Sequence, residues 1–177
     1  MMIGSLGAWL ALPAYAQNKK SVAAPASHRV EETTLPAGTR DMLARIRNAA
    51  GSGDVQKLLI PIQRNEVPPL FDRGTKQSPI ATLKARSADG EGKEMLRILL
   101  RTLEAGATPL SSGAAPTQYL WPWFANIPYA KRGATERAAS WGLVRVADIG
   151  LSTLAREPLM HRVIIGAEGT WQVFAVL

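Results

Sequence analysis

The sequence predicts an α+β fold, a mainly helical single domain that ends in a β-hairpin. Three observations lead to this prediction. Apolar residues recur at intervals of three and four along several segments between 39 and 155, as in amphipathic helices. Two short β-rich segments follow, at 159–165 and 170–177, joined by four residues that include two glycines. The chain has 177 residues, 46% of them hydrophobic and 20% charged, which suits one globular domain.

Two helices are expected at the start of the domain. Thr39 is the predicted N-cap of the first, which Gly51 ends, and Asp54 is the predicted N-cap of the second. The apolar residues of their buried faces are Met42, Leu43, Ile46, Ala50, Val55, Leu58, Leu59 and Ile62. Regular helix is excluded at Pro68 and Pro69, because proline lacks the amide hydrogen that a helix needs.

The middle of the chain contains the most regular apolar spacing. Ser78 and the proline after it predict the start of a short helix that runs to about Arg86. A longer helix is predicted over 91–105, with Gly106 at its C-terminal cap. Its apolar stripe consists of Met95, Leu96, Leu99, Leu100 and Leu103. A loop is expected over 107–116.

The last third of the chain changes from helix to strand. Helices are predicted over 135–146 and 148–155, and Pro158 ends the second. The hairpin at 159–165 and 170–177 is only marginally stable in water when alone. It must therefore pack on the helices or extend a sheet.

The N-terminus has the pattern of an export signal. Residues 3–12 form an apolar run about half as long as a bilayer span. A proline and a small-x-small end at Ala16 follow, so we expect a signal peptide at 1–16 that is cleaved before Gln17. The alternative is a buried core helix. We therefore expect a periplasmic or secreted protein with no membrane span.

Residues 17–38 are polar and small, which predicts a flexible arm ahead of a single globular domain at 39–177. The net charge is +7, and the first 16 residues contribute none of it. This excess is either a solvated cationic surface or attracts anionic envelope material, such as lipid headgroups or cell-wall polymers. No nucleic-acid motif is present.

The residue types limit the chemistry. There is no cysteine and there are two histidines, which excludes disulfides, a thiolate metal site and a cysteine nucleophile. No metal and no cofactor is expected. His161, in the first predicted hairpin strand, has a structural interpretation and a less favoured catalytic one.

An aromatic cluster is the first candidate binding site. Tyr119, Trp121, Trp123 and Phe124 fall within six positions. Four such rings present roughly 800 Å² at about 200 Å² each, more than the roughly 300–600 Å² of the largest apolar patch on a typical monomer. Most of the cluster is therefore expected to be buried. The alternative is that one ring lines a groove for a sugar, a peptide or an acyl chain.

Three carboxylates form the second candidate site. Asp89, Glu91 and Glu94 lie at the start of the predicted helix 91–105, where negative charge stabilises the helix N-terminus. Capping is the favoured interpretation. The alternatives are a cation site or an acid/base pair, although the spacing lacks the calcium-loop pattern.

Two motifs make the chain similar to a family of secreted alphaproteobacterial proteins without an assigned activity. They are Ser87-x-Asp89-Gly90-Glu91-Gly92-x-Glu94 before a leucine-rich helix, and Tyr119-x-Trp121-Pro122-x-Phe124-Ala125. Weaker elements are Pro68-Pro69 and Gly169-x-Trp171-x-x-Phe174. The resemblance covers residues 40–175 and implies secretion and a shared architecture, without a reaction.

These observations favour a non-catalytic binding or envelope-associated module. Its expected partner is an anionic envelope component or another envelope protein. The alternative is a hydrolase of cell-wall or saccharide substrate that uses two of the carboxylates Asp89, Glu91 and Glu94, facing each other about 5–9.5 Å apart. A third possibility is a ligand-filled cone like that of the nuclear transport factors, which needs four or more strands around a pocket.

Overall fold

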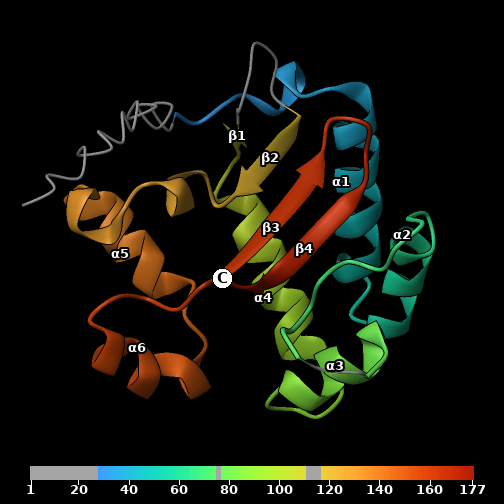
Figure 1. Ribbon diagram of the computed structural model, residues 1–177. Helices are drawn as coiled ribbons and strands as arrows, with labels where there is room; N and C mark the ends of the chain where they lie inside the picture. Colours follow the sequence, from blue (N-terminus) through green and yellow to red (C-terminus); the bar gives the residue numbers. More distant parts are fainter. Residues whose placement is uncertain (1–27, 75–76, 111–116) are drawn as a thin grey trace, which may run out of the picture.

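The computed structural model describes residues 28–74, 77–110 and 117–177. A four-stranded antiparallel sheet, in the order β1-β2-β3-β4, stands at the centre of this described part (Figure 1). Its strands are β1 Thr108–Leu110, β2 Gln118–Trp121, β3 His161–Gly166 and β4 Trp171–Val176. The α+β class and the C-terminal hairpin are confirmed, and β1 and β2 extend that hairpin into a sheet.

Helices lie on both sides of the sheet (Figure 1). The α-helices are α1 Ala37–Gly51, α2 Leu59–Ile62, α3 Pro79–Arg86, α4 Lys93–Glu104, α5 Ala134–Gly142 and α6 Ile149–Ala155. The 3-10 helices are η1 Glu32–Thr34, η2 Val55–Leu58, η3 Trp123–Asn126, η4 Tyr129–Lys131 and η5 Val146–Asp148. Helices α1 and α4 pack on each other and on β3, and α5 and α6 lie to the left of them in Figure 1.

The main core fills the space between the sheet and the helices α1 and α4. Strand residues of one face supply Trp121, Trp171 and Phe174, each at most 1% exposed. The predicted stripe of α4 meets them, because residues three and four apart share one side of a helix. Four members of that stripe are buried, namely Met95, Leu96, Leu99 and Leu103.

A smaller core covers the opposite face of the sheet. It contains Leu120, Phe124, Ala125, Leu143 and Met160. Neighbouring strand residues point to opposite faces, so Leu120 belongs to this core while Tyr119 and Trp121 belong to the main one. The sheet is therefore buried on both sides. It has the four strands that a ligand-filled cone needs, but buried side chains fill the space where the pocket of such a cone would lie.

The start of the domain differs from the expected boundary at residue 39. Val30 pairs with Ala107, and Leu35 is 4% exposed, so this end of the expected arm packs on the domain. Helix α1 begins at Ala37. Thr39 is a buried helical residue instead of the N-cap, because its hydroxyl donates a hydrogen bond of 2.9 Å to the carbonyl of Gly166 in the hairpin.

Two other predicted boundaries change. The expected loop over 107–116 contains β1, which pairs with β2. The expected helix over 135–146 ends at Gly142, since Val144 leaves the helix to pair with Met160. The predicted signal peptide at 1–16 and residues 17–27 of the arm lie outside the described residues.

None of the helices in the described segments has the length and apolarity that a bilayer crossing requires.

Candidate functional site

The first predicted site residue, Asp89, caps α4. One carboxylate oxygen accepts hydrogen bonds from the amides of Glu91 and Gly92, at 2.7 and 2.8 Å. The other oxygen accepts one from the amide of Glu94, at 2.7 Å. The surrounding protein desolvates the carboxyl group and acts to raise its pKa, but these backbone hydrogen bonds outweigh that effect and lower the pKa of Asp89 to about 2. Both oxygens therefore serve the helix start.

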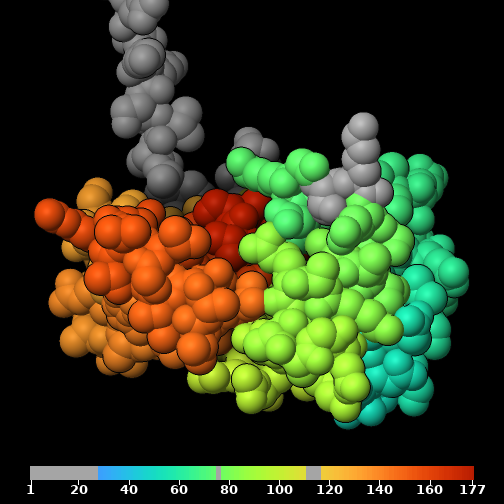
Figure 2. Space-filling view, turned by 90° about the horizontal axis from the view of Figure 1, so that it is seen from below, coloured from blue at the N-terminus to red at the C-terminus, as the bar shows by residue number. Residues whose placement is uncertain are grey.

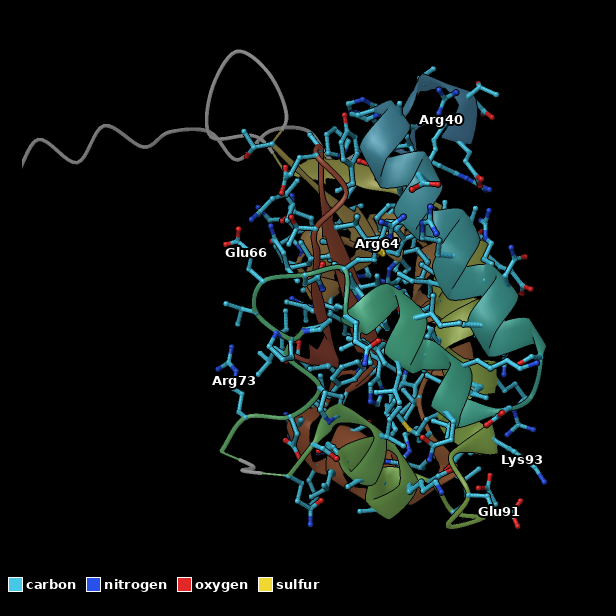
Figure 3. All side chains as sticks on the ribbon, turned by 90° about the vertical axis from the view of Figure 1, so that its right-hand side faces the viewer. Arg40, Arg64, Glu66, Arg73, Glu91 and Lys93 are labelled. Atoms are coloured by element: carbon cyan, nitrogen blue, oxygen red, sulfur yellow. The ribbon has the colours of Figure 1, made fainter. Side chains whose placement is uncertain are left out.

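Glu91 and Glu94 point in different directions. Glu91 is exposed and pairs with Lys93 at 2.5 Å, at the outer end of the α4 start (Figure 3). Glu94 accepts a hydrogen bond of 2.7 Å from the amide of Ala88 and lies 3.6 Å from the guanidinium of Arg145. Each of the three predicted carboxylates thus has its own partner. This is the arrangement of caps and ion pairs, and it lends no support to a facing catalytic pair.

The aromatic residues pack mainly inside the molecule. Tyr119 is 7% and Trp121 1% exposed, and both lie on the face of the sheet that α1 and α4 cover. Trp123 is half-buried and meets Phe124 edge to face, with 5.9 Å between the ring centroids. Trp121 lines a pocket of about 250 Å³, but its ring presents almost no surface there. Trp123 is therefore the predicted ring with the most surface for a ligand.

Arg145 organises a buried charged cluster that no sequence motif indicates. Its side chain is 7% exposed. The guanidinium donates to the carbonyl of Arg86 and lies 3.6 Å from the carboxylates of both Glu94 and Asp148. It thereby joins the end of α3, the start of α4 and η5. The only sequence signal was Glu94 itself, a carboxylate whose partner lies about fifty residues away along the chain.

His161 adjoins this cluster in β3. It is 1% exposed, and neither ring nitrogen has a hydrogen-bond partner among the described residues. The ring packs on Phe174, with 5.0 Å between centroids. Burial, together with the positive charges of Arg86 and Arg145, lowers the pKa of His161 to about 3. A neutral, enclosed imidazole on an aromatic ring fits the structural interpretation.

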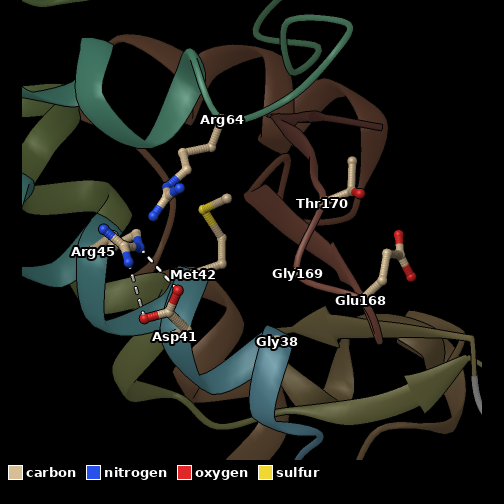
Figure 4. A pocket seen from close by; sticks show the side chains of 8 residues that line it. All are labelled: Gly38, Asp41, Met42, Arg45, Arg64, Glu168, Gly169 and Thr170. Carbon is tan, nitrogen blue, oxygen red and sulfur yellow. Dashed lines mark hydrogen bonds and ion pairs between the residues drawn. The ribbon is translucent and has the colours of Figure 1, made fainter.

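A pocket of about 240 Å³ opens where the N-terminal turn of α1 meets the β3–β4 turn (Figure 4). Arg64 reaches into it from the end of α2, above Met42, and Glu168 stands on the opposite wall. Arg45 forms an ion pair with Asp41, with 2.9 Å between Nε of Arg45 and Oδ2 of Asp41. Two arginines face two carboxylates, so the pocket has no net charge to select an ion.

Large apolar side chains are exposed in the segment that contains η5 and α6. Eight such side chains are exposed among the described residues, and five of them lie between 141 and 154 along the chain. We name them the α6 apolar patch: Trp141, Val146, Ile149, Leu151 and Leu154. Val146 is 81% and Leu154 82% exposed. The sequence pattern predicts the helix over 148–155, but a helix this short does not reveal from its spacing which of its apolar residues are exposed.

Arginines adjoin the patch. A groove of about 90 Å³ separates α4 from residues 142–146, and its lining includes Arg97, Arg101 and Arg145. We name it the arginine groove. Val146 lines this groove and also belongs to the α6 apolar patch. The two features therefore meet at Val146. Figure 2 shows the orange segment beside the green surface of α3 and α4.

Comparison with known proteins adds no relative, since no family model, curated protein or solved structure matches the chain significantly. Within the described segments, no three Asp, Glu, His or Cys side chains gather closely enough to hold a metal ion. The α6 apolar patch and the arginine groove are the candidate functional site.

Proposed function

We propose that this protein is an exported, non-catalytic module that attaches to the surface of an envelope membrane through the α6 apolar patch. The observation that carries the proposal is the exposure of Val146 and Leu154, at 81% and 82%. Apolar side chains this exposed release free energy when a lipid surface covers them.

The position of α6 supports this role. Ser152 is the one buried residue of the helix, so its apolar residues contribute little to the main core. The hydroxyl of Ser152 accepts a hydrogen bond of 3.0 Å from the amide of Leu159, which holds α6 to the chain that follows it. A helix that is anchored through Ser152 and exposes Ile149, Leu151 and Leu154 suits a surface that inserts shallowly.

The magnitudes suit reversible attachment. Full burial of one valine, leucine or isoleucine side chain is worth about 1.5–3 kcal/mol. Partial burial of four such side chains supplies several kcal/mol, and each arginine near an anionic surface adds about 1 kcal/mol. Exposed arginines without an ion-pair partner in the described segments include Arg97, Arg101, Arg137 and Arg156. The net charge of +7 acts in the same direction.

Co-sedimentation with vesicles tests the attachment. The full chain and its Leu154→Ser variant are mixed with vesicles of phosphatidylcholine and phosphatidylglycerol at low salt. We expect the wild type to sediment and the variant to bind about tenfold more weakly, since roughly 1.5 kcal/mol of apolar transfer is lost. Because the N-terminal leader is the same in both proteins, the difference between them reports α6. Equal binding of the two proteins contradicts the proposal.

Two controls separate attachment from other effects of the substitution. Leu154 is exposed, so Leu154→Ser should change the free energy of unfolding by no more than about 0.5 kcal/mol. Size-exclusion chromatography without lipid should give the same elution volume for both proteins. If Leu154→Ser instead dissociates a dimer, the patch joins two copies of the chain and the proposal fails.

Export is tested by the N-terminal residue of the product. When the full chain is produced in a bacterium, we expect a periplasmic protein that begins at Gln17. Accumulation of the uncleaved chain in the cytosol would contradict this part of the proposal.

A further inference from the structure

The arginine groove carries an unusual balance of charge. Three of its lining residues are arginines, and Glu94 is the one acidic residue among them. Glu94 is already engaged by Arg145 and by the amide of Ala88. Arg97 and Arg101 have neither a hydrogen bond nor an ion pair within the described segments. The groove therefore presents positive charge that no described side chain neutralises.

The two uncompensated arginines are placed to act together. Arg97 and Arg101 are four residues apart on α4, so they lie on successive turns of the same side of the helix. Arg101 reaches across the groove toward α5, where a Cβ at Gly142 would lie 3.7 Å from its Nη2. Arg145 also lines the groove, and its Nε has no hydrogen-bond partner in the described segments. Guanidinium groups in this arrangement suit the paired oxygens of a phosphate.

The apolar residues of the groove favour a phosphate that is attached to a hydrocarbon chain over a free phosphate ion. Ile98, Leu143 and Val146 share the lining with the arginines. Val146 leads directly into the α6 apolar patch, so a phosphate in the groove has an exposed hydrocarbon surface beside it. A phospholipid carries a phosphate next to its hydrocarbon chains and can contact both the arginines and the apolar side chains. A free phosphate ion can contact only the arginines.

We propose that the arginine groove binds the phosphate of an anionic phospholipid, held by Arg97 and Arg101, while Val146 and the rest of the α6 apolar patch contact its acyl region. This inference rests on the proposed membrane attachment and names the lipid group that the attached protein recognises. Arg145 keeps the groove in shape and takes no direct part in holding the phosphate, because its NH groups face the carbonyl of Arg86 and the carboxylates of Glu94 and Asp148, which balance its charge.

Charge-matched variants of the full chain test the assignment. Arg97→Gln and Arg101→Gln each remove one groove charge. Arg64→Gln removes the same charge from an exposed arginine without an ion pair in the described segments, in the pocket beside α2. With vesicles of phosphatidylcholine and phosphatidylglycerol, we expect each groove variant to bind about fivefold more weakly than wild type and Arg64→Gln to bind nearly as well as wild type. Equal losses from all three variants would mean unspecific charge attraction and would overturn the inference.

A competition experiment identifies phosphate as the recognised group. Inorganic phosphate should release the wild-type chain from these vesicles more effectively than chloride at the same ionic strength, and should lose this advantage with Arg97→Gln. Equal release by the two anions overturns the phosphate assignment.

The failure of this inference is distinct from the failure of the proposed function. If Leu154→Ser abolishes binding while the groove variants bind like wild type, attachment through α6 stands and the phosphate site does not. If the wild-type chain binds no vesicle, both proposals fail.

Discussion

At the scale of single residues, the buried imidazole of His161 in β3 has the clearest consequence. His161 lies beside Arg86 and Arg145, with the carboxylate of Asp72 paired to Arg86 at 2.5 Å. Protonation of the imidazole would bury a further positive charge next to two others. The folded protein therefore keeps His161 neutral, and its pKa falls to about 3.

This pKa predicts a loss of stability in mild acid. In the unfolded chain, His161 takes up a proton as the pH falls below 6.5, its ordinary pKa, whereas the folded chain resists protonation down to about pH 3. Between these values the unfolded state binds one more proton, so this residue removes about 1.4 kcal/mol of stability for each unit that the pH falls.

His161→Phe is the test, because phenylalanine keeps a ring against Phe174 and cannot titrate. Free energies of unfolding from urea titrations at several pH values should fall less steeply below pH 6.5, the ordinary histidine pKa, in the variant than in wild type. Groups such as Asp89 act in both proteins and cancel in the comparison. Parallel pH profiles would show that His161 does not stay neutral in the fold.

At the scale of elements, the contact of α1 with the hairpin turn depends on two glycines. A Cβ at Gly38 would lie 2.5 Å from the backbone of Glu168. Gly169 adopts a φ of +96° and approaches Gly38 from the other side. The hydrogen bond from Thr39 to Gly166 reinforces the same contact. Together they join the first helix to the last two strands.

Gly38→Ala should therefore destabilise the fold. The added methyl group meets backbone atoms that have no side-chain freedom, and overpacking of this kind costs about 1–3 kcal/mol. Gly51→Ala is the matched control on the same helix, since its Cβ would meet nothing within 4 Å. We expect that control to be neutral or stabilising by up to about 1 kcal/mol in thermal unfolding. Equal effects of the two substitutions would contradict the close approach.

Local sequence patterns predicted the helices well and the sheet in part. The apolar spacing that predicts α4 and the Ser78 cap that predicts α3 depend only on residues close together in the sequence. Both helices therefore lie at nearly the predicted bounds. Strand β1 has three residues and owes its conformation to pairing with β2, which a local pattern does not reveal. The sequence predicts a cap at Thr39 because the partner of its hydroxyl, Gly166, is remote along the chain.

At the scale of the whole molecule, the candidate site brings α4 together with η5 and α6, and about forty residues of the chain separate α4 from η5. The residues Tyr119, Trp121, Asp89 and Glu94 were visible in the sequence because each belongs to a compact motif. Arg97, Arg145 and Leu154 belong to none. Leu154 matters because it is exposed, and Arg97 and Arg145 matter because they line a groove between distant segments. The spacing of neighbouring residues in the sequence predicts neither the exposure nor the groove.

The central claim, that α6 enters a lipid surface, is tested most directly at Leu154. The chain contains no cysteine, so Leu154→Cys provides a single site for an environment-sensitive fluorophore. Lys57→Cys is the control, because Lys57 is an exposed residue of η2, just before α2, which lies on the opposite side of Figure 1 from α6. On addition of phosphatidylglycerol-containing vesicles, emission of the label at residue 154 should shift to the blue and that at residue 57 should stay unchanged. An unshifted label at residue 154 on protein that sediments with the vesicles would contradict the claim.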